Sequence, residues 1–141
     1  MTISTSSAVW QGGLKNGKGS FSSASGAFKG DYSFATRFDG AKGTTPEELI
    51  AAAHAACFSM ALSADLEKAG TPATSISTKA SCTLERVNDK QTLSKMRLEV
   101  RGKVAGIDQA AFAKAAEGTK ANCPVSRALN IPTVELDARL E

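Results

Sequence analysis

The sequence is poor in aromatic residues, in histidine and in runs of one charge. Aromatic residues make up 6% of the 141 residues, and there is a single histidine. Seventeen Lys and Arg residues against fourteen Asp and Glu leave a formal net charge of +3, scattered along the chain. Because no basic segment alternates with aromatic residues, we expect no nucleic-acid partner.

Long hydrophobic runs are also missing. The most apolar stretch, Leu49–Leu62, is shorter than the roughly 20 residues that cross a bilayer. The N-terminal segment MTISTSSAVW has neither a basic segment nor an apolar core, so it does not have the pattern of a secretory signal. We therefore expect a cytoplasmic protein with no membrane partner.

Cysteines are few and odd in number, at positions Cys57, Cys82 and Cys123. An odd count argues against the disulfide framework of a secreted domain. No C-x-x-C pair is present, which disfavours a structural zinc site, and we expect no bound metal. Each cysteine is then either a buried hydrophobic residue or a reactive thiol.

The composition, 42% hydrophobic, is that of one globular domain over residues 1–141. The Gly- and Ser-rich start predicts short strands in AVWQGG, GKGSFSSAS and DYSFATRFDG, with a hairpin turn at Asn16-Gly17. In YSFATRF, alternation predicts a strand with its aromatic side chains on one face and Arg37 on the other.

The strongest predicted element is a helix in GTTPEELIAAAHAACFSMALSADLEKAG. Thr44 or Thr45 can cap its start, and Pro46 suits the first helical position. Gly70 can end it. Leu49–Leu62 contains no acidic or basic residue besides one histidine, and a helix that is apolar all round is buried on every side. We expect it at the centre of the protein or in a subunit interface.

The second half predicts two strands, two helices and a last strand. SISTKASCTLERVN and LSKMRLEVRGKV alternate as a β-hairpin around Asn88-Asp89, and IDQAAFAKAAEGTKA predicts an amphipathic helix ending near Gly118. CPVSRALN predicts a short helix and IPTVELDARLE a closing strand. The order βββ-α-ββ-αα-β indicates an α+β fold.

Cys123 stands where the short helix is expected to begin. With Asn122 as cap and Pro124 in the first turn, its thiol would lie beside unpaired backbone N–H groups, which favour the thiolate. Ser126 adds a hydroxyl donor. A buried cysteine before a turn accounts for the same residues, so both interpretations stay open.

Cys57 lies in the middle of the long helix, where no helix end stabilises a thiolate. Composition alone favours a core role, and apolar surroundings would raise the thiol pKa. A reactive Cys57 needs a cation, from His54 one turn earlier or from Arg37. Glu47 or Glu48 could orient the arginine.

Two residues fit structural roles better. His54 is expected to be packed and hydrogen-bonded, because a dyad with Cys57 would lack an orienting third group. Cys82 alternates with polar neighbours on a strand, which indicates a core or sheet residue.

The blocks TRFDGAKGTTPEELIAAAHAACFSMALS and NCPVSRAL resemble the OsmC/Ohr family of osmotically inducible and organic-hydroperoxide-resistance proteins, and the OsmC branch in particular. The resemblance extends over the whole chain. It implies an OsmC-like fold around a long buried central helix. It also implies an intertwined homodimer with two active sites at the subunit interface.

The resemblance further implies a thiol-dependent peroxidase that reduces alkyl or fatty-acyl hydroperoxides without a cofactor. Cys57 matches the peroxidatic cysteine and Cys123 the resolving one. Arg37 matches the arginine that holds the thiolate, and Glu47, rather than Glu48, the carboxylate that orients it. The implied cycle passes through a Cys57 sulfenic acid and a Cys57–Cys123 disulfide, which a dithiol such as a lipoyl group on a partner protein reduces. The alternative is a non-catalytic redox-sensing or small-ligand-binding dimer.

Overall fold

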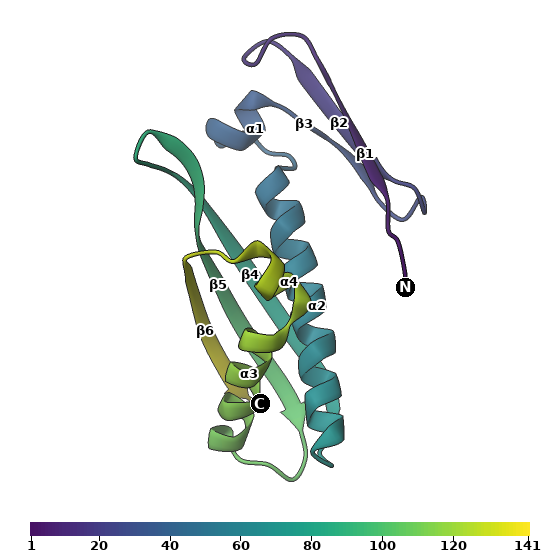
Figure 1. Ribbon diagram of the computed structural model, residues 1–141, viewed down its shortest axis with the longest axis vertical. Coiled ribbons are helices and arrows are strands. Elements are labelled where there is room, and N and C mark those ends of the chain that lie inside the picture. The colour runs from purple at the N-terminus through teal and green to yellow at the C-terminus, as the bar shows by residue number, and fades with distance from the viewer. The chain divides into compact units, whose positions relative to one another are not determined.

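The computed structural model describes residues 1–141 and divides into two compact units, Met1–Leu49 and Ile50–Glu141 (Figure 1). The elements are β1 (Ser6–Gln11), β2 (Lys18–Ser23), β3 (Lys29–Tyr32), α1 (Phe34–Phe38), α2 (Pro46–Lys68), β4 (Ala73–Val87), β5 (Lys90–Val104), α3 (Gln109–Asn122), α4 (Pro124–Leu129) and β6 (Thr133–Leu140). The predicted α+β order is confirmed, except that α1 is an additional helix.

The first unit is built on an antiparallel sheet in the order β1-β2-β3. The rings of Trp10, Phe21 and Tyr32 gather on it, with centroids 5.5 to 6.1 Å apart. The predicted turn at Asn16-Gly17 is wrong in its geometry: the positive φ of the β1–β2 loop, 91°, belongs to Gly12. A longer loop therefore joins these strands in place of a two-residue turn.

The segment FATRF forms helix α1 and not the predicted strand. Ser33 caps it: the Ser33 hydroxyl accepts from the Thr36 N–H at 3.2 Å, and the Thr36 hydroxyl accepts from the Ser33 N–H at 2.9 Å. Phe34 and Phe38 then lie one helical turn apart, with ring centroids at 4.9 Å. This capping box outweighs the alternating pattern, and it places Arg37 in the last turn of a helix.

The second unit contains a sheet in the order β4-β5-β6, with β6 parallel to β5. The predicted hairpin is confirmed, and Asn88 and Asp89 have the positive φ values, 49° and 63°, of a type I′ turn. Helices α2 and α3 share the core of this unit with one face of the sheet. That core is formed by Phe58, Leu62, Leu66, Met96, Leu98, Val100, Val104, Phe112, Ala116 and Ile131.

Helix α2 starts and ends as predicted. The Thr45 hydroxyl accepts from the Glu48 N–H at 3.0 Å, and Gly70 follows the helix with a φ of 82°. Within the second unit, however, the helix is buried on one side only. Phe58 is fully buried, but Met60 is 77% exposed on the other face. This apolar face has no partner within the second unit.

By length and composition alone, α2 could cross a membrane. One face of the helix nevertheless lies in the core of the second unit, where Phe58, Leu62 and Leu66 pack against the sheet. A core helix of a soluble protein has this arrangement. The packing of α2 therefore indicates a soluble protein.

Two predicted boundaries in the α3–α4 region are wrong. Helix α3 does not end near Gly118 but continues to Asn122, because the buried Thr119 hydroxyl donates to Asp65 on α2 at 2.7 Å and holds the extra turn. The cap of α4 is Cys123 and not Asn122. A tertiary contact therefore decides the end of α3, where a single glycine costs a helix only about 1 kcal/mol.

Two glycines of the second unit give a matched test of this packing. At Gly118 an added Cβ meets nothing, so Gly118→Ala should raise the free energy of unfolding by roughly 0.5–1 kcal/mol. At Gly102 the Cβ would lie 2.5 Å from the buried Phe112 ring, so Gly102→Ala should lower it by roughly 1–3 kcal/mol. Urea unfolding measures both, and effects of the same sign would contradict the packing described.

Candidate active site

Two thiols meet in the second unit. Cys57, from the middle of α2, and Cys123, between α3 and α4, lie 66 positions apart in the sequence, yet their Sγ atoms are 3.0 Å apart. A disulfide bond is about 2.05 Å long, so the sulfurs need to approach by only about 1 Å to form one. Cys57 is partly exposed and Cys123 is fully buried. Solvent therefore reaches Cys57 first.

The local fold explains the position of Cys123. Its own N–H donates to Thr119 at the end of α3 at 2.8 Å, and its carbonyl accepts from the Arg127 N–H at 3.0 Å. The N–H groups of Val125 and Ser126, in the first turn of α4, are directed at the sulfur. These donors have no partner within the helix, and Pro124 has no N–H to contribute.

The pKa values of the two thiols are shifted in opposite directions. Burial raises the pKa of Cys57, and the Cys123 sulfur raises it further, against the Val125 N–H. Burial also acts to raise the pKa of Cys123, but the Ser126 N–H, the Cys57 thiol and the Ser126 hydroxyl outweigh it, so this pKa is lowered. These opposite directions make Cys123 the more readily ionised of the two thiols, whose sulfurs are 3.0 Å apart.

A reactive Cys57 thiolate therefore needs a positive charge that the second unit does not supply. The candidate predicted from the sequence, Arg37, belongs to the first unit. Its Nη2 lies 2.6 Å from Oε1 of Glu47, and its Nε lies 3.0 Å from the same oxygen. Glu47 is buried, at 7% exposure, whereas Glu48 is exposed. A buried carboxylate is tolerated when such a fork-shaped pair neutralises it.

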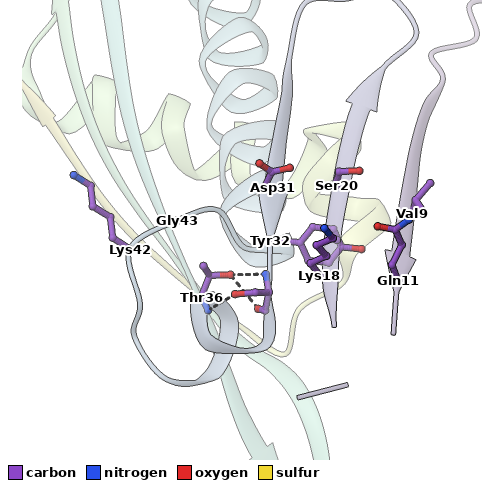
Figure 2. A pocket seen from close by; sticks show the side chains of 11 residues that line it. Val9, Gln11, Lys18, Ser20, Asp31, Tyr32, Thr36, Lys42 and Gly43 are labelled. Carbon is purple, nitrogen blue, oxygen red and sulfur yellow. Dashed lines mark hydrogen bonds between the residues drawn. The ribbon is translucent and has the colours of Figure 1, made fainter. Parts of the chain in front are cut away.

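The first unit also has a surface hollow beside its sheet and α1 (Figure 2). Lys18, Asp31, Tyr32 and Lys42 are among its lining residues. It contains no cysteine and no histidine. The hollow therefore lacks the sulfur chemistry of the second unit, and we do not assign it to the site.

His54 and Cys82 are placed as the sequence predicts. His54 is 1% exposed, its Nε2 lies 2.5 Å from the Ser126 hydroxyl, and burial lowers its pKa, so the ring is neutral. Cys82 lies on the face of β4 that packs against the core. The partnership of His54 with Ser126 was missed, because the two are 72 positions apart and no spacing rule joins them.

Comparison with known proteins relates this geometry to relatives. Residues 39–137 match the family model described as OsmC-like protein. Over 135 residues the chain is 47% identical to the peroxiredoxin OsmC of Escherichia coli (strain K12), covering 95% of this chain and 94% of the relative. Crystal structures of an organic hydroperoxide resistance protein from Elizabethkingia anophelis and of one named OsmC from Legionella pneumophila each give a TM-score of 0.76 at 22% identity, covering 99% of both chains. The chain shares their fold.

Proposed function

This chain belongs to the OsmC-like family and is a cysteine-based peroxidase, and we propose that it reduces organic hydroperoxides to alcohols with Cys57 and Cys123. The observation that carries the proposal is the 3.0 Å contact between these two sulfurs. A sulfenic acid formed on one of them would find its thiol partner already in place. Residues 1–141 act in this proposal as one functional domain.

In the first step Cys57 is the attacking sulfur, because it is the more exposed of the two. Its thiolate attacks the terminal oxygen of the hydroperoxide, and the O–O bond breaks. The departing alkoxide takes up a proton and leaves as the alcohol. Cys57 keeps the transferred oxygen as a sulfenic acid, oxidised by two electrons.

Arg37 is proposed to supply the positive charge that the Cys57 thiolate needs. Glu47 holds Nε and Nη2 of the guanidinium, and Nη1 makes no bond within the first unit. This free edge can donate to the thiolate and then to the departing alkoxide. A cation close to Cys57 would oppose the effect of burial on the pKa of that thiol.

In the second step Cys123 attacks the sulfenic acid and a Cys57–Cys123 disulfide forms. A dithiol then reduces this disulfide by two exchange reactions and is itself oxidised to a cyclic disulfide. We propose a dihydrolipoyl group on a partner protein as that dithiol, in the cytoplasm. Steady-state peroxide consumption with dihydrolipoamide tests the function: sustained turnover supports it, and a single stoichiometric oxidation would favour the redox-sensing alternative.

Substrate preference follows from burial of the alkyl tail. Each buried methylene contributes about 0.8 kcal/mol, so kcat/KM should rise about fourfold per methylene along a series of linear alkyl hydroperoxides until the tail is covered. Hydrogen peroxide, which has no tail, should be the poorest substrate. Stopped-flow oxidation of the reduced protein measures this, and equal rates along the series would contradict it.

The exposed apolar face of α2 supports the proposal of a homodimer. Ala52, Ala56 and Met60 lie exposed along this face at one-turn spacing, and Met60 is the largest of them. A second copy of the chain that buried this face would complete the burial expected of so apolar a helix.

A charge on this face should separate the dimer. Met60→Lys is expected to shift the protein from dimer to monomer in sedimentation equilibrium, because burying an unpaired ammonium costs several kcal/mol. Glu117→Lys, on the exposed side of α3, is the control and should remain dimeric. A monomeric wild-type protein, or a dimer unchanged by Met60→Lys, would rule out this interface.

A further inference from the structure

A buried histidine, His54, is linked to Cys123 through Ser126 and has no part in the proposed chemistry. His54 is on α2 one turn before Cys57 and is 1% exposed. Its Nε2 is 2.5 Å from the Ser126 hydroxyl oxygen, and Nδ1 is buried without any hydrogen-bond partner. The Ser126 hydroxyl also interacts with the Cys123 sulfur. A continuous chain of contacts therefore runs from His54 through Ser126 to Cys123.

The number of protons on His54 and Ser126 limits which hydrogen bonds can form at the same time. A neutral imidazole carries one ring proton, and a serine hydroxyl can donate only one. If Nε2 were bare, Ser126 would donate to it and could not donate to the Cys123 sulfur. If Nε2 carries the proton, it donates to Ser126, and the hydroxyl is free to donate to Cys123. The tautomer of His54 thus decides which way Ser126 donates.

The surroundings favour the second arrangement. Nδ1 is buried and has no hydrogen-bond partner, and an N–H group there without a partner would cost more than a bare ring nitrogen. Within the second unit, the only ionisable side chain acting on Cys57 is Cys123, and burial alone acts on His54. On α4, the charged Arg127 is exposed.

We propose that His54 is a positioning residue for disulfide formation: its Nε2–H fixes Ser126, whose hydroxyl then donates to the Cys123 sulfur and keeps it ready to attack. The inference rests on the proposed function of the two cysteines. In the step itself, a lone pair of the Cys123 thiolate forms the S–S bond, and the S–O bond of the Cys57 sulfenic acid breaks. Hydroxide leaves and becomes water on taking a proton from solvent. Cys123 is oxidised and the Cys57 sulfur is reduced.

Rapid-quench mass spectrometry with cumene hydroperoxide separates the two steps. His54→Phe should slow conversion of sulfenic acid to disulfide about tenfold at pH 7, because the pKa of Cys123 rises when the Ser126 hydroxyl no longer donates to its sulfur. Oxidation of Cys57 should change less than twofold. Raising the pH to 9.5 should restore the disulfide-forming rate, since the thiolate then forms without help. His54→Gln, which keeps an N–H donor near Nε2, should retain most of the rate.

A matched variant tests whether the effect of His54→Phe is purely structural. Thr119→Val removes another buried hydrogen bond of the second unit and should lower stability while leaving the pH profile of disulfide formation unchanged. A His54→Phe protein with a wild-type disulfide-forming rate, or with a slow rate that high pH does not restore, would overturn the inference alone. A wild-type protein that forms no Cys57–Cys123 disulfide would overturn the proposed function itself.

Discussion

Replacing Cys57 with serine is expected to lower the rate of organic hydroperoxide reduction on the order of a thousandfold or more. A serine hydroxyl is not ionised at neutral pH and is a far weaker nucleophile than a thiolate. In the proposed cycle Cys57 also receives the oxygen from the peroxide, so no other residue could replace it. Coupled peroxide consumption with a dithiol reductant measures the loss.

Cys123→Ser should have a different effect. The first turnover should proceed, and a sulfenic acid should accumulate on Cys57 that dimedone traps. Disulfide formation should be absent. Cys82→Ser is the matched control, because Cys82 packs against the core through β4 and has no part in the proposed cycle. A Cys57→Ser protein that keeps its activity, or a Cys82→Ser protein that loses it, would reverse the assignment.

The second large effect is expected at Arg37. Arg37→Met removes the proposed cation and should lower kcat/KM on the order of a hundredfold. The pKa of Cys57 should then stay raised by burial. Because a thiol with a raised pKa gains thiolate as the pH increases, the activity of Arg37→Met should recover toward high pH. The pH profile of kcat/KM measures both effects.

Glu47 and a distant arginine refine this test. Glu47→Gln keeps the shape but loses the charge of the carboxylate that grips Nε and Nη2, so a loss of about tenfold is expected. Arg86→Met changes an exposed arginine of the β4–β5 hairpin that pairs only with Asp89, and its activity should match that of the wild type. If Arg37→Met kept the wild-type pH profile, Arg37 would not be the residue that stabilises the thiolate.

Capping and turn residues in the sequence correctly predicted the ends of α2 and the β4–β5 hairpin. Thr45, Pro46 and Gly70 mark the ends of α2, and Asn88-Asp89 marks the turn between β4 and β5. In the segment YSFATRF two local signals pointed to different structures, and the predicted strand was wrong. The alternation of YSFATRF concealed a capping box between Ser33 and Thr36, although both residues could be seen in the sequence.

Spacing rules could not predict contacts between segments that are distant in the sequence. The Thr119–Asp65 bond extends α3 past Gly118, and the His54–Ser126 contact joins positions 72 apart. From the residues alone, Cys57 was better explained as core filling, and only the family resemblance joined it to Cys123. The structure brings these two sulfurs to 3.0 Å from each other, a proximity that no spacing rule predicts.

The most direct test is to add one equivalent of an organic hydroperoxide to the reduced protein and to follow intact and peptide masses. The account predicts loss of two hydrogens within seconds and a Cys57–Cys123 cross-linked peptide, absent in Cys57→Ser. Thiols that stay reduced, or slow oxidation confined to Cys82, would contradict it. Cys57 would then be a core residue of α2, and the small-ligand-binding alternative would take precedence.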